Sequence, residues 1–343
     1  MSDQLQLAQD ERSSDSSDRL VAKRRRRLSR RRGFTCVELV TCASVVIVMM
    51  SLCMPAVLMA WQQSRSDVCK NNLKRLGLAL HNYHDVYRMF PPGWVTREVK
   101  GLQTQGFGWQ TGLLPYIDQG NVSNLLSPDG GGFDEMDEAR MQAAKTRIRT
   151  FRCPSDTTPE FNPFREEWPT SNYSGNYGHL AIPRWLPAQA SKNWPGQVAP
   201  WFGPRSAPRN RGNAAAIDKF GDPRPTGLFS QNTCIRIQDC VDGTSNTILV
   251  GERCVTSAAG IWLGVTAGTN ENDALTDCSH ASRPNAGLSS FSSLHGVVHV
   301  SLCDGSARGL NPSVDSLPNS DPEKPLGVYQ KLAARNDGQI IEF

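Results

Sequence analysis

The chain has 343 residues, and its 37 lysines and arginines outnumber its 33 aspartates and glutamates, for a formal net charge of +4. Residues 1–33 contain ten basic and five acidic side chains, which leaves a charge of −1 on the other 310 residues. A folded nucleic-acid-binding domain would carry a basic face, so this distribution argues against nucleic acid as a partner.

An uncharged apolar stretch follows the basic run at residues 23–32. Residues 39–61 contain no charged side chain, and the next charge is Arg65. About 20 apolar helical residues cross the hydrocarbon layer of a membrane, and positive charges stay on the cytoplasmic side. We therefore predict a single-pass protein of the inner (cytoplasmic) membrane, with a cytoplasmic N-terminus and a periplasmic or exported C-terminal domain. The alternative is a secretory signal peptide, but no small-x-small cleavage site follows the stretch.

Glu38 interrupts the apolar start of this stretch, and a carboxylate in a membrane-spanning helix calls for a functional reason. The residues around it, RRGFTCVELV at 31–40, resemble the class III signal of type IV prepilins and pseudopilins. The resemblance implies that a prepilin peptidase cuts between Gly33 and Phe34 and methylates Phe34. It also implies that Glu38 pairs with the amino terminus of another pilin-like subunit during assembly, and that Pro55 permits a helix kink. The alternative is a plain membrane anchor with a stray glutamate.

A helical pattern continues beyond the apolar stretch. Residues 62–87 contain no proline and one glycine, and Pro91-Pro92 follows. Apolar side chains recur three or four residues apart, as on one face of an amphipathic helix: Leu73, Leu76, Leu80, Tyr83 and Tyr87. We predict one helix over 35–87, whose first half faces membrane lipid or other subunits and whose second half packs on a soluble domain.

These patterns divide the chain into four expected parts. They are a basic cytoplasmic leader (1–33) that is removed, the transmembrane half of the helix (34–61), its exported half (62–90) and an exported domain (91–343). Within the domain, 154–226 is dense in Pro, Gly, Trp and Arg without a sustained period, which indicates a large irregular loop insertion.

The exported domain shows short helix and strand patterns. We expect helices at 137–147 and 326–335, and strands at 148–153, 171–177, 234–237, 247–251, 260–265, 297–303 and 306–310. Asp304-Gly305 between the last two strands predicts a two-residue hairpin turn, because Gly305 permits a positive φ. A helix followed by antiparallel strands indicates the α+β class. The prepilin resemblance implies the type IV pilin-like fold, in which the long helix packs across an antiparallel sheet.

Six stretches of the body resemble, in the same order, a large bacterial family of prepilin-like proteins of unknown function. They are residues 69–85, 108–117, 151–156, 171–178, 242–252 and 295–305. The last is a variant of the family's C-terminal His-X9-Asp-Gly signature, since only eight residues separate His295 from Asp304. A one-residue change reverses the facing along a strand, so no role of His295 is carried over. On a regular strand His299 shares a face with His295. The resemblance implies an exported, membrane-tethered filament or secretion subunit and no established reaction.

Seven of the ten cysteines lie outside the membrane stretch, where an oxidising compartment permits disulfides. Two pairs are plausible: Cys234 with Cys240, which are near in sequence, and Cys69 with Cys153, because the helix must pack on the domain. Free buried thiols are the alternative, and connectivity cannot be read from a sequence. No C-x-x-C occurs, so a ribbon-type zinc site is not predicted.

Oxygen-rich turns offer weak candidates for a calcium site at Asp242 and Asp304, since calcium prefers carboxylate and carbonyl ligands. Such side chains more often cap their own turns, and we expect no other cofactor. Aromatic residues in 168–202 suggest either a carbohydrate-binding face or buried loop packing.

The sequence therefore favours a structural role. The leading hypothesis is a prepilin-like subunit of a type IV pilus-like filament or a type II secretion pseudopilus. The alternative is a monomeric membrane-anchored module whose insertion binds a polymer or solute. No sequence motif of a nucleophile, general base or catalytic metal is present, so we expect no enzymatic activity.

Overall fold

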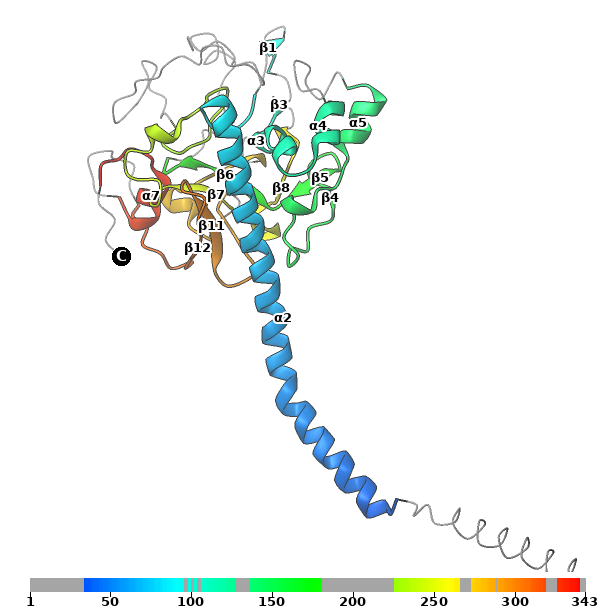
Figure 1. Cartoon of the computed structure of the whole chain (residues 1–343). Helices are drawn as coiled ribbons and strands as arrows, with labels where there is room; N and C mark the ends of the chain where they lie inside the picture. Colours follow the sequence, from blue (N-terminus) through cyan, green and yellow to red (C-terminus); the bar gives the residue numbers. More distant parts are fainter. Residues whose placement is uncertain are drawn as a thin grey trace, which may run out of the picture. The chain divides into compact units, whose positions relative to one another are not determined.

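The computed structural model describes residues 34–95, 98–99, 102–103, 106–126, 136–180, 225–265, 273–287, 289–318 and 326–339. The leader 1–33, with Gly33, and residues 181–224 of the expected insertion lie outside this set. The chain divides into two compact units, Met1–Ala60 and Trp61–Phe343. The helix α2, Cys36–Tyr87, contributes residues to both (Figure 1). The predicted helix over 35–87 is confirmed to within one residue.

In the first unit, α2 exposes a continuous set of apolar side chains. Phe34 is 80% exposed, and the helix continues through Pro55. At its start, Glu38 Oε2 accepts hydrogen bonds from the backbone N (2.9 Å) and the hydroxyl (3.0 Å) of Thr35. The backbone N of Glu38 donates to Thr35 Oγ1. This reciprocal pair is a capping box that satisfies free amide groups at the helix N-terminus. In the described part of the chain, α2 is the helix long and apolar enough to cross a membrane, which is compatible with single-pass anchoring.

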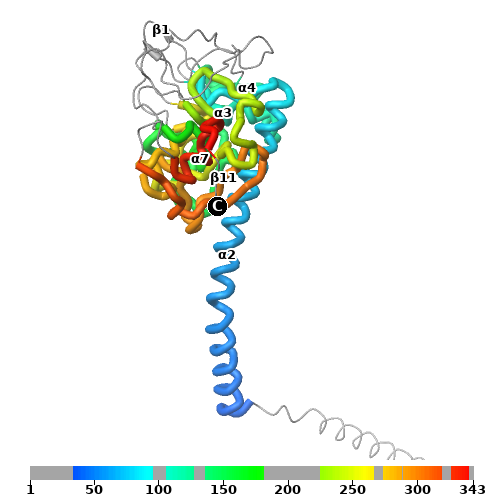
Figure 2. Tube along the Cα trace, turned by 90° about the vertical axis from the view of Figure 1, so that its left-hand side faces the viewer, coloured from blue at the N-terminus to red at the C-terminus, as the bar shows by residue number. Residues whose placement is uncertain are grey.

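In the second unit, α2 presents one face to the protein interior (Figure 2). Four members of the predicted stripe are buried, and Tyr87 packs at the edge of the same core. The buried residues of the helix are Ser66, Cys69, Asn72, Leu73, Leu76, Gly77, Ala79, Leu80 and Tyr83. The stripe prediction is thus confirmed, and the helix supplies part of the core of this unit.

The main sheet has five strands in the order β10-β6-β7-β11-β12. Their bounds are β6 Tyr173–Gly178, β7 Ile248–Glu252, β10 Leu275–Asp277, β11 Val298–Leu302 and β12 Ala307–Leu310. The pairs β6–β7, β7–β11 and β11–β12 are antiparallel, whereas β10 and β6 are parallel. The sheet is therefore mixed, and the expected antiparallel sheet is corrected at this edge. The α+β class agrees with the long helix and these strands.

The two faces of the sheet differ in chemistry, as β11 shows. Val298, Val300 and Leu302 join a cluster with Tyr329 and Leu332 of α7, Val328–Ala333. Because successive strand residues alternate, His299 and Ser301 face the other side. Contacts of these two residues with Ser66 and Gly77 identify that side as the one covered by α2. The sheet thus lies between α2 and α7, and a polar pair of strand residues faces the long helix.

Smaller elements surround this sheet. The short strands are β1 Glu98–Val99, β2 Leu102–Gln103, β3 Gly106–Phe107, β4 Phe161–Asn162, β5 Trp168–Ser171, β8 Gly260–Ile261 and β9 Gly264–Val265, paired as β1-β2, β3-β9 and β4-β5-β8. The helices are α3 Trp109–Gly112, α4 Gly120–Leu126 and α5 Glu138–Ala144. Single 3-10 turns are η1 Leu114–Tyr116, η3 Arg149–Phe151, η4 Ile237–Asp239, η5 Val255–Ser257 and η7 His280–Ser282.

Two of the predicted strands are wrong. Residues 148–153 contain η3. The backbone around η3 is hydrogen-bonded to Asn172 and not to a neighbouring strand: Asn172 N donates to Phe151 O (2.8 Å), and Cys153 N donates to Asn172 Oδ1 (2.9 Å). Residues 234–237 lead into η4, where Ile235 O accepts from Phe90 N. In both segments apolar side chains enter the core from irregular backbone, which a short apolar run cannot distinguish from a strand.

The predicted hairpin forms between β11 and β12, but its loop is longer than expected. Leu302 O accepts from Gly305 N (2.9 Å), and Leu302 N donates to Ser306 O (2.8 Å). Three residues, Cys303, Asp304 and Gly305, therefore form the loop. Gly305 has φ +81°, so the positive φ is confirmed and the two-residue turn is wrong. A turn followed by a left-handed glycine is the common three-residue solution.

Candidate functional site

Four side chains with metal-binding or acid–base chemistry converge between α2 and the domain. They are Cys69 of α2, Cys153 after η3, Glu252 at the end of β7 and His295 before β11. One donor atom of each lies within 4.8 Å of the donor atoms of the other three. Three of these residues are buried and His295 is partly buried. We call this group the Cys-Cys-Glu-His cluster.

The two sulfur atoms and the imidazole of the cluster are in close contact. Cys69 Sγ and Cys153 Sγ are 2.6 Å apart, and both are free thiols in the structure. His295 Nε2 lies 3.3 Å from Cys69 Sγ and 3.4 Å from Cys153 Sγ. The structure thus brings together the cysteines predicted to pair, with an imidazole nitrogen almost equidistant from them.

Proton affinities within the cluster are set by these contacts. The hydrogen bond from the Cys69 thiol, assisted by His295, lowers the pKa of Cys153 to about 6. The same bond, with burial, raises the pKa of Cys69. The bond to Cys153 raises the pKa of His295. A thiolate on Cys153 is therefore the favoured ionised form of the pair, and thiolates are the forms of cysteine that bind metals or attack electrophiles.

Within the described residues, one carboxylate oxygen of Glu252 has hydrogen-bond partners and the other has none. It is 2% exposed. Its Oε2 accepts from the backbone N (2.9 Å) and lies 3.1 Å from Nδ1 of His299, whereas its buried Oε1 has no hydrogen-bond partner among the described residues. An unsatisfied buried carboxylate oxygen is costly, so this atom marks a place where a ligand would be stabilising.

Ser66 completes a row with His299 and Glu252. Ser66 Oγ lies 3.3 Å from His299 Nε2. With Nδ1–H donated to Glu252, Nε2 is left to accept from the serine hydroxyl. The order resembles a hydrolytic triad, but Ser66 is buried in the middle of a helix, where a substrate has no approach. The row therefore orients the carboxylate of Glu252.

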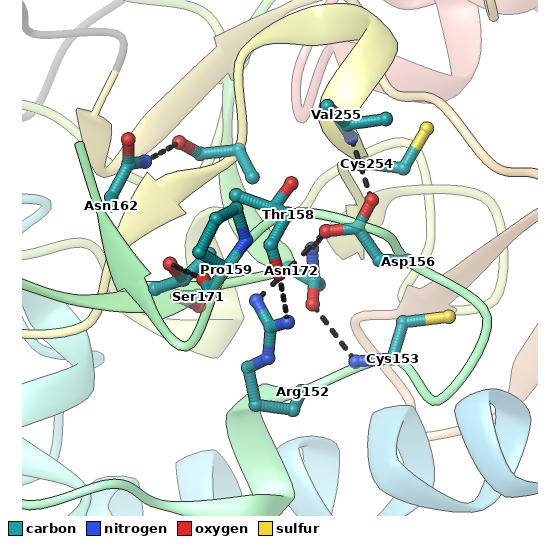
Figure 3. A network of polar contacts seen from close by, with 12 residues as sticks. Arg152, Cys153, Asp156, Thr158, Pro159, Asn162, Ser171, Asn172, Cys254 and Val255 are labelled. Atoms are coloured by element: carbon teal, nitrogen blue, oxygen red, sulfur yellow. Dashed lines mark hydrogen bonds and ion pairs between the residues drawn. The ribbon is translucent and has the colours of Figure 1, made fainter. Parts of the chain in front are cut away.

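A polar network fixes the cluster from the side of Cys153 (Figure 3). The buried side chain of Asn172 accepts from Cys153 N, and donates to Asp156 Oδ2 (2.6 Å) and to Arg253 O (3.2 Å). Asp156 Oδ1 in turn accepts from Val255 N (2.8 Å). Asn172, between β5 and β6, thus ties the segment carrying Cys153 to the segment that follows Glu252.

The comparison with protein families identifies the body of the chain. The family described as "Protein of unknown function (DUF1559)" matches residues 60–317, about three quarters of the sequence. The chain belongs to this family. The DUF1559 family is associated with pilin-like or exported proteins. No curated protein and no solved structure matches the chain.

The calcium candidates of this DUF1559 protein accept hydrogen bonds from backbone amides. Asp242 accepts from Asp337 N (2.6 Å) and Gly338 N (2.9 Å), and so ties down the C-terminal segment. Asp304 Oδ1 accepts from Ser306 N (2.8 Å) within the hairpin loop. The Asp304 contact is the turn-capping arrangement weighed against calcium, whereas the Asp242 contacts join two segments that are far apart in the sequence. Calcium binding at these positions stays a prediction.

The second predicted cysteine pair, Cys234 with Cys240, stays a prediction, and both are free thiols in the structure. Cys240 Sγ lies 3.3 Å from Cys303 Sγ, in the hairpin loop, and both residues are buried. Cys240 therefore has a sulfur neighbour, Cys303, that its position in the sequence did not suggest. The reason is that η4 turns the chain after Ile237, which directs Cys240 toward the core shared with β11 and β12.

Sequence reasoning placed three members of the cluster on separate grounds and missed the fourth. No family role was carried over to His295, because of the shortened spacing to Asp304. The structure places it before β11, which begins at Val298, so strand alternation does not apply to it. Its ring lies 6.0 Å from that of His299. The missed fourth member is Glu252, which ends an apolar strand. An acidic residue at the end of an apolar run was the one sequence feature that could have indicated it.

Proposed function

We propose that the chain is a prepilin-like subunit that is assembled into a type IV pilus-like or type II secretion pseudopilus-like filament. A prepilin peptidase would cut between Gly33 and Phe34 and methylate Phe34. The mature chain would be anchored in the inner membrane with its domain in the periplasm. Its partners would be other pilin-like subunits and membrane lipid, not nucleic acid, and it would act without catalysis.

The observation that carries this proposal is the difference in burial between the two halves of α2. The helix exposes apolar side chains throughout its first half and buries one face of its second half in the domain core. An exposed apolar surface of this size needs lipid or neighbouring helices to cover it. A helix that is both anchor and core element is what a filament subunit requires.

Glu38 supports the proposal through its position. Cleavage before Phe34 would create a cationic α-amino group one helical turn away. In the uncleaved chain, the Glu38 carboxylate is engaged by Thr35 of its own helix. Two roles are thus open to this carboxylate, local capping and pairing with a second subunit, and they can be separated by mutation.

Processing is tested by mass spectrometry of the full chain isolated from its native membrane. The expected N-terminus is N-methylated Phe34. Gly33→Leu should leave the precursor uncut, whereas Ser29→Ala, in the same leader, should be processed normally. An intact Met1 in the unmutated chain, or a cut beyond Ala60, would defeat the proposal.

Assembly is tested by crosslinking of processed chains in membranes. Glu38→Ala should abolish crosslinked oligomers while processing continues. Thr35→Ala breaks the same capping box but keeps the carboxylate, so it should retain assembly, and Ser51→Ala on the same helix is a further control. Equal loss in Glu38→Ala and Thr35→Ala would reduce Glu38 to a helix cap. A processed chain that stays monomeric would favour the alternative, an anchored binding module for a polymer or solute.

A further inference from the structure

The Cys-Cys-Glu-His cluster contains the donor types of a structural zinc site. Zinc in proteins takes cysteine sulfur at about 2.3 Å, histidine nitrogen at about 2.0 Å and carboxylate oxygen at about 2.1 Å, usually with four ligands in a tetrahedron. The cluster offers two sulfurs, one imidazole nitrogen and one carboxylate, all mutually within 4.8 Å. The donors come from four segments of the chain, so the site has no spacing motif in the sequence.

We propose that Cys69, Cys153, Glu252 and His295 bind one zinc ion, which fastens α2 to the domain. This site is independent of whether the chain is processed or assembled.

The two sulfur–nitrogen distances fit this assignment, and the sulfur–sulfur distance is shorter than a zinc site requires. A sulfur and a nitrogen bound to one tetrahedral zinc lie about 3.5 Å apart, and the imidazole Nε2 lies 3.3 and 3.4 Å from the two sulfurs. Two bound sulfurs lie about 3.8 Å apart, compared with the 2.6 Å observed. Entry of the ion therefore requires the sulfurs to separate by about 1 Å.

The surroundings of the cluster favour a metal over a simple disulfide. A disulfide would use the two sulfurs and leave the imidazole of His295 and the buried Oε1 of Glu252 without a function. Glu252 Oε1 has no hydrogen-bond partner within the described part of the chain, and Oε2 is fixed by the backbone and ring of His299. Orientation of a ligand by a second hydrogen-bonded group is typical of metal sites. A divalent cation would also offset the negative charge that two thiolates and a carboxylate bring together.

The test uses the full chain purified in detergent, reduced and freed of metal, and then titrated with Co²⁺ and with Zn²⁺. Co²⁺ reports its ligands by absorption, because cysteine thiolates give an intense near-ultraviolet charge-transfer band and tetrahedral coordination gives visible bands. We expect one equivalent of Co²⁺ with both signals, displaced by one equivalent of Zn²⁺. Excess Zn²⁺ should raise the Tm of the unmutated chain, because it binds the folded form.

Variants separate this site from other thiols. His295→Ala, at the partly exposed ligand, should weaken Co²⁺ binding by at least about tenfold, and Cys69→Ser should remove the charge-transfer band. Cys240→Ser is the matched control, since Cys240 and Cys303 also form a close buried thiol pair but are not part of the cluster. Circular dichroism of the metal-free variants checks that each is folded.

Three results would overturn the proposal. The first is the absence of a stoichiometric Co²⁺ complex in the reduced, folded chain. The second is a charge-transfer band lost in Cys240→Ser but retained in Cys69→Ser. The third is a Cys69–Cys153 disulfide, found by alkylation and mass mapping in the chain isolated from its own membrane.

Discussion

Ser301 Oγ lies close to Gly77 of the long helix. A Cβ added to Gly77 would be 2.9 Å from this oxygen and 3.2 Å from Gly305 Cα. The long helix therefore approaches β11 and the hairpin loop so closely that a side chain at position 77 would require its neighbours to shift. The serine hydroxyl can rotate away, but the backbone of the hairpin cannot.

This contact predicts a large effect of Gly77→Val. The added methyl groups would push α2 away from β11, and overpacking of this kind costs about 1–3 kcal/mol. The Tm of the full chain in detergent should fall by several degrees. Leu78→Val, one position along on the exposed side of the helix, introduces the same β-branched residue without the clash. An equal fall in both variants would assign the effect to helix propensity.

The hairpin loop gives a second prediction. Gly305 has φ +81°, a left-handed conformation that disfavours any side chain. Gly305→Ala should lower the free energy of unfolding by about 1 kcal/mol. Gly309→Ala in β12, where a Cβ would meet nothing closer than 3.6 Å, should cause no such loss. Denaturant unfolding of the two variants checks this, and equal stability would contradict the role of the loop.

Asn172 provides a third prediction. Its buried side chain satisfies Cys153 N, Asp156 Oδ2 and Arg253 O. Asn172→Ala would leave several buried polar groups without partners, at about 1–3 kcal/mol each. We expect a loss of about 3 kcal/mol in the free energy of unfolding. Asn311→Ala, at an exposed turn, is the control and should cost less than about 0.5 kcal/mol. A loss at Asn172 no larger than at Asn311 would contradict the network.

A fourth prediction concerns pH. Burial, together with neighbouring Asp242, raises the pKa of Asp337 to about 6, above the usual 3.9 of an unfolded chain. Between these two values the folded state holds a proton that the unfolded state has lost. The stabilisation is therefore fully present below about pH 4 and is lost as the pH rises through 6.

Asp337→Asn should remove this dependence. At pH 7.5 the variant should be more stable than the unmutated chain, by about 1 kcal/mol after allowing for the solvent that reaches a half-buried carboxyl. Below pH 4 the two should be equal. Thermal unfolding measured from pH 4 to 8 gives the difference directly, and a difference that does not change with pH would contradict the raised pKa.

Local patterns predicted the regular elements well. Periodicity located α2 and its buried face. The elements β11, α5 and α7 lie within the expected segments, and β7 extends one residue beyond its segment, to Glu252. Where side chains enter the core from irregular backbone, as at Ile148 and Ile235, the same apolar signal was misread as a strand. The parallel strand β10 has no local signature, because its pairing with β6 joins chain segments that are 99–100 residues apart.

The candidate site was harder to predict from local sequence patterns than the regular elements. A metal site on one helix or loop has a recognisable spacing, but Cys69, Cys153, Glu252 and His295 meet only after the tertiary fold has formed. The Cys69–Cys153 proximity followed from the need to pack α2 on the domain. The positions of Glu252 and His295 depend on the end of β7 and the chain path before β11, which the sequence does not specify locally.

The buried face of α2 has a practical consequence for release of the domain from a membrane. Leu73, Leu76 and Leu80 belong to the same core as the strands, so a soluble fragment that began after Tyr87 would lack part of its own interior. Proteolytic shedding compatible with a folded product would have to cut before Ser66, where burial of the helix begins. An expression fragment of the domain should likewise start between residues 61 and 65, after the start of the second unit and before the first buried residue of the helix.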